Sequence, residues 1–387
     1  MPDQSVRVGV VAGDASGDLL GAQLIASLHA LRPALRVVGL AGRQMQAQGA
    51  ESYASMDKLS MRRTGASAIR GREQRGFRLR LTERLLDERP ALYVGIDAPE
   101  FNLAIARQLK GAGVKTLQYV GPPVWAWRRW RVRRLARSVD RVLTLFPFET
   151  TTYEQAGIPA TFVGHPLADS VPLDVDKAAA RTQLRLPHGR LIVALLPCRL
   201  PNSRRDLTEI LVKAARRFYN EVKDVHFVVP AASREYRESF ESMLRLHADG
   251  DLPLTVLFGH AHEALAAADL ALVSSGAESL EAALFKTPMV IVHRTTTPSA
   301  WLTRWPSSSR PCIGLPNLLA GTAVVPEYVQ RQATPWGLAE ALMTLMREPQ
   351  ARERQIERFR EIHQRLRQDH AQKTSDAVLG MLDDAVG

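Results

Sequence analysis

The chain has 387 residues, 45% of them hydrophobic, and a formal net charge of +11 at pH 7. This length suits two domains, and this hydrophobic content excludes a disordered chain. Two cysteines exclude a disulfide framework or a cysteine-based zinc site, and the positive charge favours an anionic partner such as a phosphorylated ligand, a nucleic acid or an acidic membrane surface.

Short apolar runs alternate with longer amphipathic segments along most of the chain, which predicts strands alternating with helices. Helix 18–31, for example, has four leucines on one face. Six strands are predicted in the first half, at 6–12, 37–40, 92–96, 115–120, 141–144 and 160–163. After residue 169 the pattern restarts, with strands at 191–196, 225–229, 254–258, 270–273 and 289–292.

Two successive series of this kind predict an α/β fold with two parallel sheets, each covered by helices on both faces. The segment "GHPLADSVPLDVD" interrupts the periodicity and marks the boundary. We therefore predict an N-terminal domain at 1–168, a C-terminal domain at 169–347, and a helical segment at 348–387 that packs at the domain junction. No run of roughly 18 apolar residues and no secretion signal is present, which predicts a protein that is soluble or lies on a membrane surface without crossing it. The two cysteines favour a reducing, cytoplasmic setting.

The first predicted strand leads into the glycine-rich turn "VAGDASGDLLG" at residues 11–21. Such a turn entering a helix often binds phosphate, but Asp14 and Asp18 would repel one. Sugar hydroxyl groups suit these side chains better, since carboxylates accept their hydrogen bonds. A loop in which Ser16 is only the helix N-cap is an equally good interpretation.

The strand predicted at 92–96 is followed by Asp97, and Pro99 prevents the strand from continuing. In parallel sheets, ligands collect at the carboxyl ends of the strands, so Asp97 is a candidate functional acid. An aspartate here could equally serve as the N-cap or Asx-turn residue of the next helix. The residues alone leave both interpretations open.

Residues 119–137, "YVGPPVWAWRRWRVRRLAR", interleave six arginines with three tryptophans, Trp125, Trp127 and Trp130. Arginine beside tryptophan can bind phosphates or stack on bases, and the same composition suits an amphipathic helix at a membrane interface. A solvated basic face is the third interpretation. Structural or ligand-contacting roles, and no metal, are predicted for His165, His260 and His262.

Residues 271–285, "ALVSSGAESLEAALF", predict a strand, a tight turn and a helix. The turn at 275–277 offers backbone N–H groups that suit a diphosphate. Glu281, about one turn into the helix, could accept hydrogen bonds from both hydroxyls of a ribose, or it could be a solvated helical glutamate. Glu278 stabilises the helix dipole but competes with a bound phosphate.

Six segments are specific when taken together: "VAGDASGD", "VGIDAPEFN", "YVGPPVWAWR", "LFPFE", "FVGHPLAD" and "LPNLLAG". Their order and spacing resemble the lipid-A-disaccharide synthase family from about residue 6 to the C-terminus. The resemblance implies the GT-B architecture, in which two Rossmann-like doubly wound domains face a cleft. It also implies that the acceptor binds the N-terminal domain, that UDP-sugar binds the C-terminal one, and that C-terminal helices cross back to the N-terminal domain.

The resemblance implies an inverting glycosyltransferase of lipid A biosynthesis that requires no metal or other cofactor. A UDP-linked 2,3-diacylglucosamine donates its sugar to the 6-hydroxyl of 2,3-diacylglucosamine 1-phosphate, which yields the β-1,6 disaccharide 1-phosphate and UDP. The implied partners are these substrates and the anionic inner face of the inner membrane, where the tryptophans at 119–137 would bind. No nucleic acid is expected, and the family allows a homodimer.

Residue by residue, the resemblance assigns Asp97 as the general base on the acceptor hydroxyl. The family usually has glutamate where this chain has Asp14. The other matches are Asp14, Ser16 and Gly17 on the acceptor side, and Ser275, Gly276, Glu281 and Asn317 on the donor side.

Three stretches depart from the family pattern, at 59–78, 195–210 and 295–317. In the second, strict register gives Leu200 where the family has an arginine for the leaving diphosphate, so Arg199 or Arg204 would have to replace it. Each departure is abrupt and bounded by good matches, which favours a local reading-frame slip. The alternatives are a catalytically impaired relative, another UDP-sugar enzyme of this architecture and, from a different class, a nucleic-acid binder built on the basic stripe.

Overall fold

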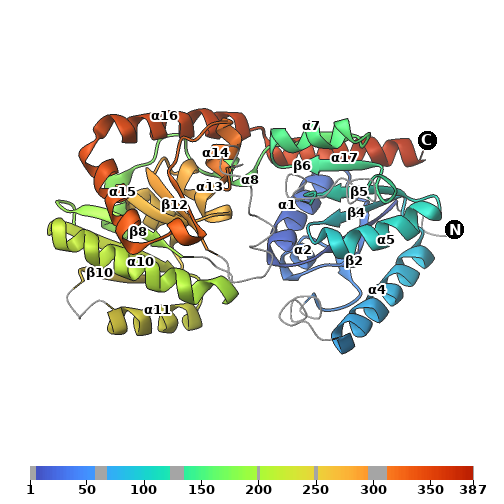
Figure 1. The fold of residues 1–387 in the computed structure, drawn as a ribbon. Helices are drawn as coiled ribbons and strands as arrows, with labels where there is room; N and C mark the ends of the chain where they lie inside the picture. The colour runs from blue at the N-terminus through green and yellow to red at the C-terminus, as the bar shows by residue number, and fades with distance from the viewer. Residues whose placement is uncertain are drawn as a thin grey trace. The chain divides into compact units, whose positions relative to one another are not determined.

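The computed structural model describes residues 6–56, 68–122, 135–197, 201–247, 252–294 and 312–386, and their side chains except those of 68–72, 201–206 and 386. The chain divides into two compact units (Figure 1). Unit 1 comprises Met1–Asp169 and Leu366–Gly387, and unit 2 comprises Ser170–Arg365.

Unit 1 contains a seven-stranded parallel sheet with the strand order β3-β2-β1-β4-β5-β6-β7. The strands are β1 Arg7–Ala12, β2 Arg36–Leu40, β3 Glu51–Ser52, β4 Leu92–Ile96, β5 Lys115–Tyr119, β6 Arg141–Thr144 and β7 Ala160–Phe162. The helices are α1 Ala15–Leu31, α2 Arg43–Ala47, α4 Ala68–Glu88, α5 Pro99–Gly111, α7 Pro147–Gln155, α8 Pro166–Ser170 and α17 His370–Val386.

Unit 2 contains a six-stranded parallel sheet with the order β10-β9-β8-β11-β12-β13. The strands are β8 Leu191–Leu196, β9 Val225–Ala231, β10 Leu254–Phe258, β11 Leu270–Ser274, β12 Met289–His293 and β13 Glu327–Val329. The helices are α9 Lys177–Gln183, α10 Pro201–Glu221, α11 Arg234–His247, α12 Ala261–Ala267, α13 Ala277–Leu284, α14 Leu315–Ala320, α15 Pro335–Arg347 and α16 Pro349–Leu366. A short 3-10 helix follows β13 at Gln330–Gln332.

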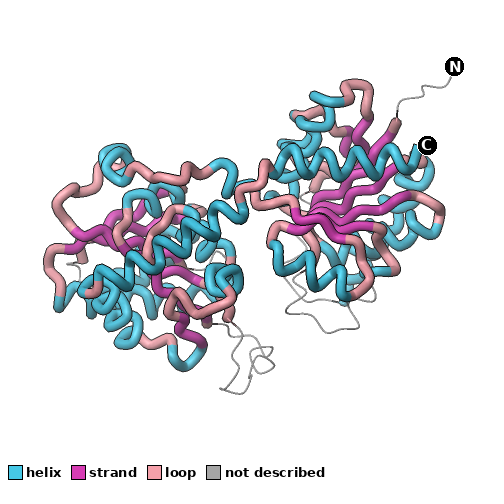
Figure 2. Tube along the Cα trace, turned by 90° about the horizontal axis from the view of Figure 1, so that it is seen from above, coloured by secondary structure: helices cyan, strands magenta, loops and turns pink. Residues whose placement is uncertain are grey.

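Helices cover both faces of the unit 1 sheet (Figure 2), because successive side chains of each strand point to opposite faces. Val8 and Val10 of β1 pack in a cluster with residues of α1 and α17. Val11 and Tyr93 point the other way and pack with residues of α4 and α5. Each fully buried side chain of this kind contributes about 1.5–3 kcal/mol, so burial on both faces holds the sheet edge that carries the loops described below.

The predicted α/β class is confirmed, and all eleven predicted strands are present with ends that differ by at most two residues. The sequence missed β3 and β13, which are only two and three residues long. The predicted helical tail consists of two helices, α16 in unit 2 and α17 in unit 1. The second of these therefore brings the C-terminus back to the N-terminal sheet, as the resemblance implied.

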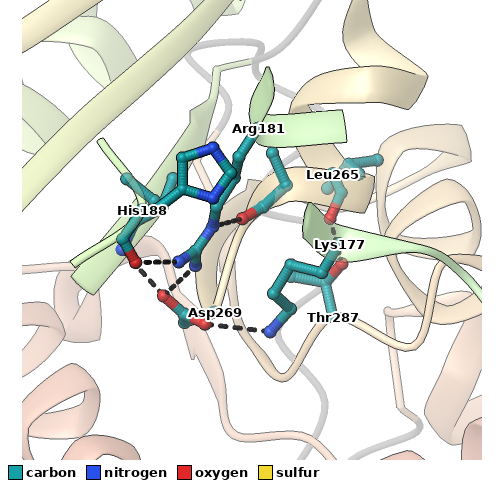
Figure 3. Close-up of polar contacts among 8 residues, drawn as sticks. Lys177, Arg181, His188, Leu265, Asp269 and Thr287 are labelled. Atoms are coloured by element: carbon teal, nitrogen blue, oxygen red, sulfur yellow. Dashed lines mark hydrogen bonds and ion pairs between the residues drawn. The ribbon is translucent and has the colours of Figure 1, made fainter. Parts of the chain in front are cut away.

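A partly buried ion-pair cluster fixes α9, the first helix that lies wholly in unit 2 (Figure 3). Arg181 Nη2 lies 2.5 Å from Asp269 Oδ2, and Lys177 Nζ lies 2.9 Å from Asp269 Oδ1. Desolvation is the largest effect on the pKa of Asp269 and raises it, but the N–H of Ile192 and the two cations together hold this pKa below its ordinary value. The carboxylate therefore joins α9 to the beginnings of β8 and β11.

Candidate functional site

Both sheets reverse their strand order at one point, and ligands of such sheets bind at the carboxyl ends of the strands there. In unit 1 this switch point lies between β1 and β4. Asp14 lies in the loop after β1, Ser16 lies in the first turn of α1 that follows it, and the loop after β4 carries Asp97. The two segments meet, since Ser16 Oγ lies 3.3 Å from Asp97 Oδ2 although 81 positions separate these residues.

Asp14 is the N-cap of α1, and the alternative that Ser16 caps this helix is wrong. Asp14 Oδ1 accepts hydrogen bonds from the backbone N–H groups of Ser16 and Gly17, both at 3.1 Å, and from Ser16 Oγ at 2.6 Å. The exposed Ser16 hydroxyl has one proton, so it donates to Asp14 or Asp97 but not to both at once. Three oxygen atoms that can accept hydrogen bonds thus lie close together at this edge of the sheet: Asp14 Oδ1, Ser16 Oγ and Asp97 Oδ2.

Asp18 does not share this site. Its carboxylate is 5% exposed and accepts hydrogen bonds from the backbone N–H groups of Gln44 at 3.0 Å and Met45 at 3.1 Å, in the first turn of α2. A Cβ atom on Gly42 would lie 2.3 Å from Asp18 Oδ2, so only glycine allows this approach. Asp18 therefore positions α2 against α1.

Asp97 lies before the cap of α5, and the interpretation of Asp97 as an N-cap is wrong. The N-cap is Ala98, and helix α5 begins at Pro99. Asp97 and Ala98 have φ angles of 51° and 39°, in the left-handed region that non-glycine residues rarely adopt. Asp97 Oδ1 accepts a hydrogen bond from the N–H of Ala98 at 2.8 Å, and its Oδ2 faces Ser16. This half-buried carboxylate remains accessible to a ligand.

In unit 2 the switch point lies between β8 and β11, and β11 is followed by the turn predicted to bind a diphosphate. The N–H of Ser275 donates to Val292 O at 3.0 Å, so this group is not available to a ligand. Ser275 Oγ lies 2.6 Å from His293 Nδ1, and burial lowers the pKa of His293. Gly276 has a φ of 114° and is the N-cap of α13, which turns the following N–H groups toward the helix N-terminus.

Glu278 and Glu281 are 6% and 8% exposed, so the interpretation of Glu281 as a solvated glutamate is wrong. Glu278 contributes to the wall of a cavity of about 300 Å³ at the same edge of the sheet. Its other walls come from the ends of β8 and β9, from α11, and from the turn after β10 together with the start of α12, including Leu196, Ala231, Tyr236, Gly259, His260 and His262.

Asn317 lies in α14 and is 1% exposed. Its Oδ1 accepts hydrogen bonds from the N–H groups of Val324 and Val325, both at 2.8 Å. Its Nδ2 donates to Val325 O at 2.8 Å and to Glu327 Oε1 at 2.7 Å. The whole amide is thus used to hold the chain between α14 and β13.

The histidines of the sequence motifs have structural contacts. His165 Nδ1 accepts a hydrogen bond from the N–H of Leu167 at 3.2 Å, and burial, helped by nearby His370, lowers the pKa of His165 to about 3. His262 packs against Phe285 with ring centroids 5.3 Å apart. In the described parts of the chain, no group of three or more His, Cys, Asp and Glu side chains could hold a metal ion.

Four candidate residues, Arg199, Trp125, Trp127 and Trp130, lie outside the described residues, as does most of the basic segment 119–137. Arg204 lies in α10, and the description of that part of the helix covers only the backbone. Among the helices that the structure describes, none has the length and apolar composition needed to span a membrane.

The chain is similar to known proteins over nearly its whole length. Residues 8–380 match the family model described as lipid-A-disaccharide synthetase. Lipid-A-disaccharide synthase from Dechloromonas aromatica (strain RCB) is 45% identical over 380 residues, which covers 98% of this chain and 99% of the relative. The enzyme from Azotobacter vinelandii (strain DJ / ATCC BAA-1303) is 44% identical over 383 residues, with the same coverage.

Solved structures of lower identity share the fold. MurG from Acinetobacter baumannii superposes with a TM-score of 0.60 at 17% identity and covers 97% of this chain and 99% of its own. The UDP-GlcNAc 2-epimerase from Neisseria meningitidis, bound to UDP-GlcNAc, gives 0.62 at 10% identity, with coverage of 97% and 100%. Anabaena HepE in complex with UDP and glucose gives 0.54 at 13% identity, with coverage of 98% and 100%.

Proposed function

Because the chain belongs to the lipid-A-disaccharide synthase family, we propose that Asp97 is the general base of its reaction and that Ser275, Gly276 and Glu281 hold the donor. The enzyme is a glycosyltransferase that uses a UDP-sugar to make the lipid A disaccharide. The proposal concerns which residues of this chain carry out that reaction, on which acceptor, and at which surface.

The acceptor in this proposal is 2,3-diacylglucosamine 1-phosphate. Asp97 removes the proton of its 6-hydroxyl while the oxygen attacks the anomeric carbon of the donor sugar, and the bond from that carbon to UDP breaks. The new bond forms on the face opposite the leaving group, which gives inversion and a β-1,6 linkage. The observation that carries the assignment is the half-buried Asp97 carboxylate, held before the cap of α5 with one oxygen directed at the Ser16 hydroxyl.

Ser16 and Asp14 support this role through hydrogen bonds. The Ser16 hydroxyl oxygen lies 3.3 Å from Asp97 and 2.6 Å from Asp14. Its proton can therefore be donated to Asp97 while that carboxylate is ionised, and to Asp14 once Asp97 has taken the proton of the acceptor. Asp14 is fixed by two backbone N–H groups of α1, which keeps its carboxylate in place beside the acceptor. Gly17 allows the start of α1 to lie close to the end of β4, because a Cβ atom at position 17 would lie only 3.3 Å from Ile96 O.

On the donor side, the N–H groups that follow Gly276 and the dipole of α13 attract the diphosphate. Glu281 accepts hydrogen bonds from the ribose, and the cavity beside Glu278 takes the uracil ring. Asn317 acts indirectly in this proposal, because its amide is fully used by the segment between α14 and β13. Arg199 and Arg204 are the candidates for offsetting the charge on the departing UDP.

We further propose that the enzyme works as a peripheral protein at the inner face of the inner membrane. The proposed substrates carry acyl chains, and the net charge of +11 favours an anionic surface, where each nearby basic residue contributes about 1 kcal/mol. Sedimentation with anionic vesicles that is lost with zwitterionic vesicles would support this, and equal binding to both would exclude it. We also propose that the chain forms a homodimer, as the family resemblance allows. Light scattering that gives the mass of two chains would support this, and the mass of one chain, 42.9 kDa, would exclude it.

The test of the base is UDP release from UDP-2,3-diacylglucosamine with the acylated glucosamine 1-phosphate, comparing the natural chain with Asp97→Asn. We expect the variant to lose about 10²–10⁴-fold in kcat, the range that general bases contribute. Asp87→Asn, at an exposed carboxylate of α4, is the matched control. Undiminished turnover in Asp97→Asn would exclude the assignment, and a natural chain without turnover would favour the impaired relative.

A further inference from the structure

Two buried amide side chains surround the main chain of Asp97. Asn102 lies on α5 and Gln118 lies on β5, and both are 0% exposed. Asn102 Nδ2 lies 2.7 Å from Asp97 O, and Gln118 Nε2 lies 3.0 Å from the same oxygen. The carbonyl group of the proposed base therefore accepts two hydrogen bonds from side chains of two different elements.

Asn102 also ties the two loops of the site to each other. Its Nδ2 lies 3.1 Å from Ile96 O and 3.2 Å from Val11 O, at the ends of β4 and β1. Its Oδ1 accepts a hydrogen bond from Tyr93 Oη at 3.3 Å. An asparagine is a poor residue for a helix interior, so these contacts, rather than helix formation, account for its position on the buried face of α5.

Gln118 ties the loop after β4 to the turn after β5. Its Nε2 donates to Val120 O at 3.1 Å as well as to Asp97 O, and Val120 has a φ of 64°. Its Oε1 has no hydrogen-bond partner in the parts of the chain that the structure describes. Gln118 therefore acts through its N–H groups.

The glycines around these amides explain why both fit. A Cβ atom on Gly95, in the middle of β4, would lie 2.8 Å from the Cβ of Asn102 and 3.0 Å from Oε1 of Gln118. A Cβ atom on Gly13 would lie 2.0 Å from the Cβ of Ala98. Glycine inside a strand is unfavourable unless another group must approach closely. The missing side chain of Gly95 therefore leaves the space that the two amide side chains occupy.

The left-handed backbone at Asp97 and Ala98 needs such support, because strained residues persist only where their surroundings determine them. We propose that Asn102 and Gln118 are positioning residues that hold the Asp97 turn in this conformation and so direct its carboxylate toward the acceptor. This proposal rests on the assignment of Asp97 as the general base. It predicts that loss of either amide lowers the rate of the chemical step and leaves donor binding intact.

The test uses the full chain with the substitutions Asn102→Leu and Gln118→Met, each close in volume to the natural side chain. We expect kcat to fall about 100-fold in each, since a displacement of about 1 Å costs that much, while KM for the donor changes less than about twofold. Gln355→Leu is the matched control, because Gln355 is a buried amide that bonds to the main chain of Met289 in unit 2. It should leave kcat unchanged.

A double-mutant cycle separates positioning from a general loss of structure. In the Asp97→Asn background, Asn102→Leu should cause no further loss of the residual turnover. The same loss in both backgrounds, or full kcat in folded Asn102→Leu and Gln118→Met, overturns the proposal. Full turnover in Asp97→Asn alone instead refutes the base assignment on which the proposal rests. If the melting curve shows that Asn102→Leu does not fold, the same comparison is made with Gln118→Met in the natural chain and in Asp97→Asn, and its result supports or overturns the proposal.

Discussion

Replacing Arg181 with methionine tests whether the cluster in Figure 3 anchors α9 in unit 2. The substitution keeps most of the side-chain volume and removes the guanidinium from Asp269 and from the carbonyl oxygens of Ala267 and His188. Breaking a buried ion pair on one side costs about 3–5 kcal/mol. Because the Asp269 side chain is 27% exposed and Lys177 still contacts it, we expect the lower end, about 3 kcal/mol.

The assay is thermal unfolding of the full chain. The transition of unit 2 should fall by about 6–12 °C, since 1 kcal/mol corresponds to about 2–4 °C in a domain of this size. Lys177→Met is the control, because its side chain is 47% exposed and such ion pairs contribute at most about 1 kcal/mol. UDP release at room temperature should be unchanged, since Asp269 precedes β11 and the donor turn follows it. A midpoint for Arg181→Met no lower than that for Lys177→Met would refute the reasoning.

Two further substitutions have clear expectations. Burial raises the pKa of Glu149 from 4.5 to about 8. Between these values the folded state holds a proton that the unfolded chain has released, so stability falls as pH rises, by up to about 1.4 kcal/mol per pH unit. Melting curves should therefore show that the stability of Glu149→Gln relative to the natural chain increases as pH rises through this window. Glu154→Gln, at an exposed position, should show no such trend. Gly13→Ala should abolish UDP release, because its Cβ atom would lie 2.0 Å from the Cβ of Ala98, whereas Gly111→Ala meets nothing within 4 Å and should be active.

Among the strands that the sequence predicted, several consist of nearly continuous apolar residues. β4 and β11 are buried at every position, and a continuous apolar run is the pattern that parallel sheets produce. β3 and β13 have two and three half-buried or exposed residues, too few for any periodicity. Both are edge strands of their sheets, where one neighbour alone determines the pairing. Their position depends on tertiary contacts that a local pattern does not contain.

The sequence predicted which loops form the site, but it did not predict which contacts the individual residues make there. The carboxyl ends of the strands located Asp14 and Asp97, yet the sequence left Asp97 open as a cap because it does not reveal a left-handed φ angle. Asn102 lies within the segment "VGIDAPEFN" and received no role. The available signal was a polar residue on the face of α5 that otherwise buries Phe101 and Ile105. Recognising its function requires the three carbonyl oxygens that only the folded chain brings together.

The two switch points offer opposite hydrogen-bonding groups, and this difference fits the proposed reaction. In unit 1 the left-handed turn is built from Asp97 and Ala98, with side-chain amides on its main chain, and it presents carboxylate and hydroxyl oxygens. In unit 2 the left-handed turn is Gly276, and it leads directly into the N–H groups of α13. A hydroxyl that must lose a proton needs acceptors, whereas a diphosphate that gains charge as it leaves needs donors. In the proposed reaction, a chain with the two turns exchanged would therefore neither deprotonate the acceptor hydroxyl nor bind the leaving diphosphate, even if each unit still folded.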